Sequence, residues 1–176
     1  MSDEEATSAG KPKTPSESRV ELTQAMGIED SNLQGNVHGG VIMKLVDTAG
    51  GYAAVRHAGG PVVTAAIDEM SFLEPVNVGD LVTVKATVND VGKTSLEVGV
   101  RVETENLMTG NKAHTSTAYL VFVALEPETR KPRTVPPLIA ETDAEKRRMR
   151  EAKLRRQHRL QRRDALLAQR EKQHDS

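Results

Sequence analysis

The chain has 176 residues, of which 37% are hydrophobic, 28% charged and only 2% aromatic, a composition that fits one globular domain with polar extensions. Its apolar runs are shorter than the roughly 18 residues of a membrane-spanning helix, which argues against an integral membrane protein. The absence of cysteine excludes disulfides, zinc knuckles, iron–sulfur clusters and cysteine nucleophiles. Since the first twenty residues show no apolar signal-peptide core, we expect a cytoplasmic protein.

The first half of the chain predicts a leader, a strand and a helix. Residues 1–18 are rich in Ser, Thr, Pro, Lys and Glu without apolar periodicity, so we expect a disordered leader. Residues 19–26 alternate apolar and polar side chains, which predicts a short strand. The segment from Gly40 onward is apolar on nearly every side, which predicts a buried helix. Gly50 and Gly51 weaken a helix interior, so we expect this helix to pack closely against a sheet.

Four later segments alternate with a period of two, which predicts strands. The short turn-like links between them leave no room for a crossover, so neighbouring strands should be antiparallel. We therefore expect an α+β fold in which the sheet wraps around the buried central helix and a second copy covers the helix's open side. The four segments are residues 62–67, 81–88, 95–103 and 114–125.

The last part of the chain predicts a basic helix. Residues 127–140 form a Pro-rich linker, and residues 141–176 contain strong helix formers without Gly or Pro. This tail holds 12 Lys+Arg against 7 Asp+Glu, a net charge of +5, whereas the remaining residues carry −6 of the overall −1. Its apolar residues keep no steady heptad, so we prefer a solvated or loosely docked helix over a coiled coil.

Asp47 is the most informative single residue. A carboxylate inside an otherwise apolar helix loses hydration unless it finds partners, which makes it a candidate functional group. The alternative is an ion pair with Lys44, three residues earlier on the same helix.

A glycine pair stands where this helix begins. Asn36 can cap the helix, and the free N–H groups of Gly39 and Gly40, at the positive end of the helix dipole, can stabilise an oxyanion. A tightly packed glycine turn is the alternative. Asp47 lies two turns along the same helix, so one element would offer both a carboxylate and an oxyanion site.

The residues around this pair resemble a known family. Residues 30–50, DSNLQGNVHGGVIMKLVDTAG, closely resemble the signature of the hot-dog-fold acyl-CoA thioesterases, in the branch of the cytosolic (brain-type) acyl-CoA hydrolase and its small bacterial relatives. Similar landmarks follow in the family's order at residues 63–68, 72–75, 78–80 and 91–95. The resemblance spans residues 19–126, and the predicted order of elements is that of the hot-dog fold.

The resemblance implies hydrolysis of an acyl-CoA thioester to a free carboxylic acid and CoA. Asp47 and Asn32 match the catalytic carboxylate and amide positions of the family, which meet across a dimer interface. Asp47 would act as general base or as nucleophile, while Gly40 N–H polarises the carbonyl and Asn32 orients the water or the carbonyl oxygen. Without the resemblance, Asn32 is better interpreted as closing an Asx-turn.

The resemblance also implies how the substrate is held. Lys93, Thr94 and Ser95 are expected to contact CoA phosphates, and Arg56 is a weaker candidate whose alternative is an exposed helix-end cation. His38 belongs to the oxyanion and substrate-binding group with the glycine pair, although we prefer a packing or capping role for it. No metal site is expected, and no cofactor beyond the CoA of the substrate.

The expected assembly is a homodimer, with a trimer of dimers as the larger form that the resemblance implies, and the expected role is in fatty acid metabolism. The alternative function is a non-catalytic acyl-CoA-binding regulator whose basic tail contacts nucleic acid. We consider it weaker because the tail has no aromatic stacking residue and no recognisable helix-turn-helix. Hydratase activity is disfavoured as well, since its Asp-plus-His pattern is not evident.

Overall fold

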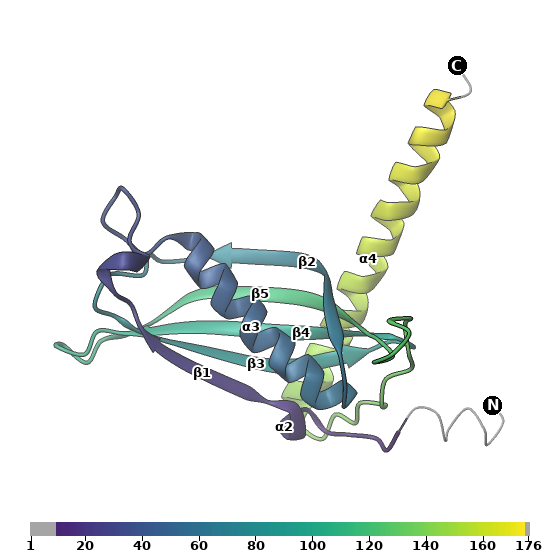
Figure 1. The fold of residues 1–176 in the computed structure, drawn as a ribbon, viewed down its shortest axis with the longest axis horizontal. Helices are drawn as coiled ribbons and strands as arrows, with labels where there is room; N and C mark the ends of the chain where they lie inside the picture. The colour runs from purple at the N-terminus through teal and green to yellow at the C-terminus, as the bar shows by residue number, and fades with distance from the viewer. Residues whose placement is uncertain (1–9, 175–176) are drawn as a thin grey trace.

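The fold is one antiparallel sheet with a helix on each face. The computed structural model describes the backbone of residues 10–174 and the side chains of residues 10–170. All neighbouring strands pair antiparallel in the order β1-β3-β4-β5-β2, which confirms the expected α+β architecture (Figure 1). The strands are β1 (Val20–Ala25), β2 (Val62–Phe72), β3 (Leu81–Val91), β4 (Ser95–Glu105) and β5 (Lys112–Ala124), and the helices are α2 (Pro15–Ser18), η1 (Ile28–Asp30), α3 (Gly39–Ala58) and α4 (Asp143–His174).

Strand β2 is longer and less regular than its sequence suggested. The period-two pattern predicted a strand over residues 62–67, whereas β2 continues to Phe72. Its pairing with β5 shifts register between Thr64 and Ala66 and again between Ile67 and Glu69. Such irregularities bend a strand and redirect its side chains. As a result, β2 curves at the edge of the sheet beside α3 (Figure 1).

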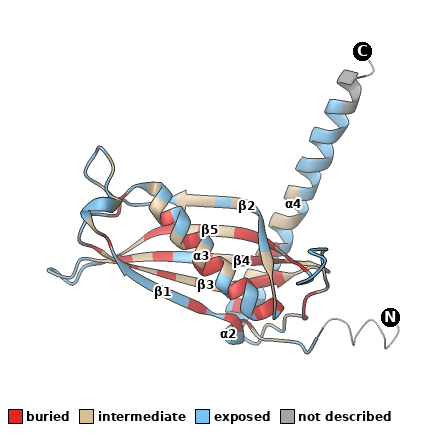
Figure 2. Cartoon of the chain, in the orientation of Figure 1, coloured by how far each residue is buried: buried red, intermediate tan, exposed pale blue. Residues whose placement is uncertain are grey.

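Helix α3 is buried on one side only. Its inner face packs on the sheet through Ile42, Val46, Ala49, Ala53 and Ala54. Its outer face leaves three large apolar residues substantially exposed, as the alternation of colours along the helix shows (Figure 2). A five-stranded sheet covers one face of the helix and leaves the other open in a single chain, and this open side is the one that the sequence predicted a second copy would cover. The three exposed residues are Met43, Tyr52 and Val55, at 42%, 55% and 41%.

The close approach of α3 to the sheet depends on Gly50. A Cβ atom at this position would lie 3.2 Å from Cζ of Phe122, which is itself fully buried. At Gly51 the nearest such contact would be an ordinary 3.8 Å. The expected role in tight packing thus holds for Gly50, and Gly51 faces away from the closest contact.

The segment before β1 is ordered by a distant part of the chain. Lys13 N–H donates to Pro137 O at 2.9 Å, and Ile139 N–H donates to Lys13 O at 2.9 Å. Pro15 and Ser18 of α2 are buried. The expectation of a disordered leader is wrong for residues 10–18, because its backbone finds partners far along the chain that composition cannot reveal. The remainder of the leader, residues 1–9, lies outside the described residues.

The predicted Pro-rich linker is packed against the domain. Val135 is buried, its N–H donates to Lys93 O at 3.0 Å, and Pro136 O lies 2.9 Å from Nε2 of the buried His57. These contacts hold the segment over the carboxyl end of α3.

Helix α4 begins at a capping box and crosses the face of the sheet opposite α3 (Figure 1). Thr142 Oγ1 accepts from Glu145 N–H at 3.2 Å, and Glu145 Oε2 accepts from Thr142 N–H at 3.0 Å. The first half is docked, with Ala152 only 1% exposed, whereas residues 160–170 are exposed and project past β2 (Figure 2). Within residues 10–174, no helix is both long and apolar enough to cross a membrane.

Candidate active site

The amino end of α3 is capped by His38. Its Nδ1 accepts a hydrogen bond from Gly40 N–H at 2.9 Å, so His38, and not Asn36, is the N-cap. An N-cap side chain bonds the second or third amide of its helix, which is the relation seen here. The amide that the sequence suggested as the oxyanion donor, Gly40 N–H, is thus already in use. Among the described residues, no acceptor pairs with the neighbouring Gly39 N–H.

Asn32 forms the Asx-turn considered as its alternative role. Its Oδ1 accepts from Gln34 N–H at 2.8 Å and from Asn36 N–H at 3.3 Å. The loop is closed further by Asn32 N–H, which donates to Asn36 O at 2.7 Å. These bonds use the oxygen of the Asn32 side chain and leave its Nδ2 group without a partner among the described residues.

A cavity of about 340 Å³ lies between this loop and the amino end of α3. Asn32 and Gly39 line it together with Ile42 and Phe72. The Phe72 ring lies close to the start of the helix, where a Cβ atom at Gly39 would be in ordinary contact with it, 3.6 Å from Cζ. The cavity therefore places an amide side chain and an unpaired backbone N–H beside apolar surface.

Asp47 lies two turns further along α3 and is held by β2. Thr64 Oγ1 donates a hydrogen bond of 2.8 Å to Asp47 Oδ1. The first register shift of β2 follows Thr64 immediately, so the bent strand brings this hydroxyl to the helix.

The surroundings of Asp47 differ from both sequence interpretations. The side chain is exposed in the single chain, so the expected loss of hydration is wrong for one protomer. No ion pair joins it to Lys44 among the described residues, which removes the alternative. Asp47 is exposed because it lies away from the sheet-facing side of α3, one turn from the exposed Met43 on that helix.

The residues expected to contact CoA lie at the other end of α3. The carbonyl groups of Lys93 and Thr94 accept from Val135 N–H and Ala124 N–H, and Gly92 N–H donates to Ser95 O. The Lys93 side chain is exposed. Arg56, in the last turn of the same helix, donates from Nη1 to Arg19 O at 2.6 Å.

One chain therefore holds the predicted site residues in three separate groups. Asn32, His38, Gly39 and Gly40 surround the amino end of α3, Asp47 lies at its middle, and Arg56 lies near its carboxyl end with residues 93–95. Asp47 is eight residues from Gly39, which corresponds to about 12 Å along a helix axis. The structure does not bring Asn32 to Asp47 within one protomer.

Comparison with known proteins identifies the family. The Thioesterase superfamily model matches residues 34–110. The uncharacterized acyl-CoA thioester hydrolase YkhA of Bacillus subtilis is 37% identical over 129 residues, which cover 73% of this chain and 74% of that protein. The chain belongs to the thioesterase superfamily. The mouse cytosolic acyl coenzyme A thioester hydrolase is 34% identical over 145 residues, which are 81% of this chain but only 38% of the mouse protein.

Solved structures of thioesterases share the fold, and the hot-dog fold is confirmed. A Staphylococcus aureus acyl-CoA hydrolase in complex with butyryl coenzyme A, coenzyme A and coenzyme A disulfide superimposes with a TM-score of 0.82 at 33% identity, covering 90% of this chain and 96% of that one. An apo-hexameric acyl-CoA thioesterase gives a TM-score of 0.84 at 34% identity, covering 87% and 97%. Variants of the S. aureus enzyme with an aspartate, an asparagine or a threonine replaced by alanine have also been solved.

For this thioesterase-superfamily chain, sequence reasoning missed Thr64. The run at residues 63–68 was recognised as a family landmark without a role for any member. The available signal was a hydroxyl in an apolar strand directly after the buried helix. Its meaning depends on the register shift of β2, which brings the hydroxyl to Asp47.

Proposed function

We propose that this chain hydrolyses acyl-CoA thioesters to a free carboxylic acid and CoA. The observation that carries the proposal is the hydrogen bond between Thr64 and Asp47, which fixes a carboxylate two turns from the amide end of the same helix. Hydrolysis of a thioester needs a base or nucleophile and a donor for the oxyanion that develops on the carbonyl. Asp47 supplies the base or nucleophile, and the backbone N–H groups at the start of α3 supply the oxyanion donor.

The spacing of residues in the S. aureus enzyme supports the same assignment. The asparagine and aspartate replaced in its variants are 15 positions apart, and the aspartate and threonine are 17 apart. Asn32, Asp47 and Thr64 have the same two spacings here. We therefore assign Asp47 as the catalytic carboxylate, Asn32 as the amide that orients water or substrate, and Thr64 as the residue that positions Asp47.

A homodimer would complete this site. Asn32 and Asp47 are apart in one protomer, and α3 exposes the apolar residues Met43, Tyr52 and Val55 on its side away from the sheet. A second chain on this face would cover the apolar residues and bring its own Asn32 loop toward Asp47. Because β2 is an edge strand, two such strands can also pair and continue the sheet. A trimer of such dimers is proposed by analogy with the hexameric thioesterase.

In this site, Asp47 either removes a proton from the attacking water or attacks the thioester carbon itself, forming an anhydride that water then cleaves. In both routes the thioester C–S bond breaks and the sulfur leaves as the thiol of CoA. The oxyanion would be stabilised by Gly39 N–H, which has no acceptor in the described part of the chain, and by Gly40 N–H when His38 turns away.

The CoA phosphates are assigned to Lys93, Thr94 and Ser95, with Arg56 at the same end of α3. The bonds that fix the backbone of this turn leave the exposed Lys93 ammonium available to a phosphate. We propose no metal or cofactor beyond the CoA of the substrate. A cytoplasmic location is proposed by analogy with the mouse enzyme, which is named as cytosolic.

A nucleic-acid partner for the tail is not proposed. Arg155 and Arg159 of α4 form ion pairs with Glu97 and Asp68 of the sheet, so these two cations are committed within the chain.

Release of free thiol from short, medium and long acyl-CoAs tests the proposed activity. Asp47→Asn should reduce kcat by at least about 100-fold, since the amide can neither accept the proton nor attack. Asp143→Asn is the matched control, because this carboxylate is fully exposed at the start of α4 and should leave turnover unchanged. Size-exclusion chromatography with light scattering checks that both variants assemble as the parent does. Parental turnover by the Asp47 variant would contradict the assignment.

A further inference from the structure

Helix α4 crosses the sheet from β3 to β2 in about two turns. Glu151 lines a recess together with Thr87 of β3. Arg155, one turn later, bonds Glu97 of β4 at 2.7 Å and stacks 3.6 Å above the ring of Tyr119 in β5. The eight residues from Glu151 to Arg159 rise about 12 Å along the helix, close to the roughly 14 Å of three strand spacings.

The next turn brings α4 to the edge of the sheet. Arg159 forms an ion pair with Asp68 of β2, the last strand on this side. The turn after that therefore lies where a further strand would be.

The docking face of α4 continues beyond this edge. Arg159 is followed at helical spacing by Arg163, Leu166 and Arg170, which occupy the same side of the helix. Leu166 and its neighbour Leu167 are 45% and 48% exposed. A helix face that packs on a sheet for its first half thus has no sheet beneath its second half.

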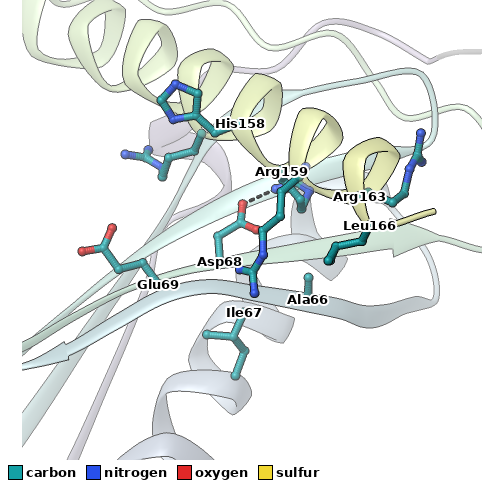
Figure 3. Close-up of a pocket in the computed structure, with 10 residues that line it drawn as sticks. Ala66, Ile67, Asp68, Glu69, His158, Arg159, Arg163 and Leu166 are labelled. Atoms are coloured by element: carbon teal, nitrogen blue, oxygen red, sulfur yellow. Dashed lines mark hydrogen bonds and ion pairs between the residues drawn. The ribbon is translucent and has the colours of Figure 1, made fainter. Parts of the chain in front are cut away.

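An open groove of about 530 Å³ lies between the overhanging helix and β2. Figure 3 shows Arg159 and Leu166 on the helix side of this groove and Asp68 and Glu69 on the strand side, with the Arg159–Asp68 ion pair joining the two sides. Arg162 and Glu69 also line the groove, and neither has an oppositely charged partner among the described residues. Arg162 on the helix is positive and Glu69 on the strand is negative, so the helix of one chain would be complementary in charge to the β2 edge of a second chain.

We infer that residues 160–170 of α4 dock on the outer face of the second subunit's sheet, with Arg162 beside Glu69 of the partner subunit. The inference rests on the proposed dimer through β2, in which the partner's strand continues the sheet beneath the overhang. Since a two-fold interface repeats every contact, each helix clasps the other subunit. The tail then serves as a dimer clasp, and its leucines are covered by the partner.

A mixing experiment distinguishes a contact between subunits from one within a chain. Arg162→Glu and Glu69→Arg are each expected to raise the dimer dissociation constant about tenfold, because each brings like charges together. When the two variant proteins are mixed, both contacts between subunits become complementary, while the pairing within each chain stays repulsive. Native mass spectrometry should therefore show heterodimers above the statistical half. Arg150→Glu, on the opposite face of α4, is the matched control and should change neither measurement.

Each other outcome overturns the inference in a recognisable way. A parent protein that is monomeric at micromolar concentration would remove the proposed dimer as well. If the variants form dimers of unchanged affinity and mix statistically, the proposed dimer is kept and the clasp is contradicted. If the variants lose only the hexamer, the clasp between the two subunits of a dimer is contradicted as well. If the dimer stays unchanged but Arg162→Glu abolishes binding of pyrophosphate in calorimetry, the groove is an anion site instead.

Discussion

Thr64 Oγ1 donates a hydrogen bond of 2.8 Å to Asp47 Oδ1, joining the edge strand β2 to the middle of α3. The bond fixes one oxygen of the carboxylate, and the other oxygen has no hydrogen-bond partner within the described residues. Because Asp47 is otherwise exposed on the helix, this hydroxyl determines the direction in which the carboxylate points.

Removal of the hydroxyl should reduce turnover. Thr64→Val keeps the shape of the side chain and loses the bond, so we expect kcat to fall about 10- to 100-fold through misorientation of Asp47. Thr64→Ser retains the donor and should stay within about threefold of the parent. Steady-state thiol-release kinetics measure both, and equal kcat values for the two variants would show that the bond does not position the carboxylate.

Loss of the His38 cap should affect stability more than catalysis. His38→Ala leaves Gly40 N–H without its acceptor, so the free energy of unfolding should fall by about 1 kcal/mol. His38→Asn offers a capping oxygen and should recover most of this loss. Urea unfolding gives the stabilities. A drop in kcat in both variants at unchanged stability would instead assign His38 to the chemistry.

The buried His57 should make stability depend on pH. Burial lowers the pKa of His57 from 6.5, and its Nδ1 has no hydrogen-bond partner in the part of the chain that the structure describes. Between the lowered pKa and 6.5 the unfolded chain binds more protons than the folded one, so the free energy of unfolding decreases as the pH falls through this range.

Urea unfolding at several pH values from about 7.5 to about 5 brackets the ordinary pKa of histidine and checks this. His57→Gln keeps a donor toward Pro136 O and cannot be protonated, so its stability should vary less with pH. His158→Gln is the control, because this histidine is exposed on α4. An unchanged pH dependence in His57→Gln would assign the effect to other groups.

The docking of α4 should depend on the Arg155–Glu97 pair. Arg155→Ala leaves the nearly buried Glu97 without its bidentate partner, and we expect a loss of about 2–3 kcal/mol in the free energy of unfolding. Arg147→Ala removes an exposed pair of 3.9 Å and should cost no more than about 0.5 kcal/mol.

A double-mutant cycle with Glu97→Ala isolates the pair itself. The sum of the two single-variant losses in the free energy of unfolding should exceed the loss in the double variant by about 1 kcal/mol or more. Additive losses would show that α4 is held by its apolar contacts instead.

The main elements of the fold could be predicted because their patterns are local. Alternation with a period of two marked four of the strands, and their short links required antiparallel pairing. That residues 10–18 are ordered could not be predicted, since Lys13 in this segment hydrogen-bonds backbone groups of residues 137–139, far along the chain. The packing of a Pro-rich segment over His57 is a contact of the same long-range kind.

The candidate site was predictable in its residues and less so in its geometry. The signature at residues 30–50 and the helical spacing from the glycine pair to Asp47 indicated a carboxylate and an amide end on one element. Which amide is free depended on the rotation of one imidazole, and no pattern in the sequence encodes that rotation.

The sequence by itself determined which groups this protein possesses: a carboxylate on an apolar helix, a glycine pair before that helix, and a basic tail of strong helix formers. Only the tertiary structure decided which groups meet. Thr64 reaches Asp47 because β2 bends at a register shift, and α4 runs off the sheet because it reaches the edge strand β2 at Arg159, well before the helix ends. Periodicity reports the face on which a side chain lies, whereas a contact between distant segments depends on how whole elements bend and cross.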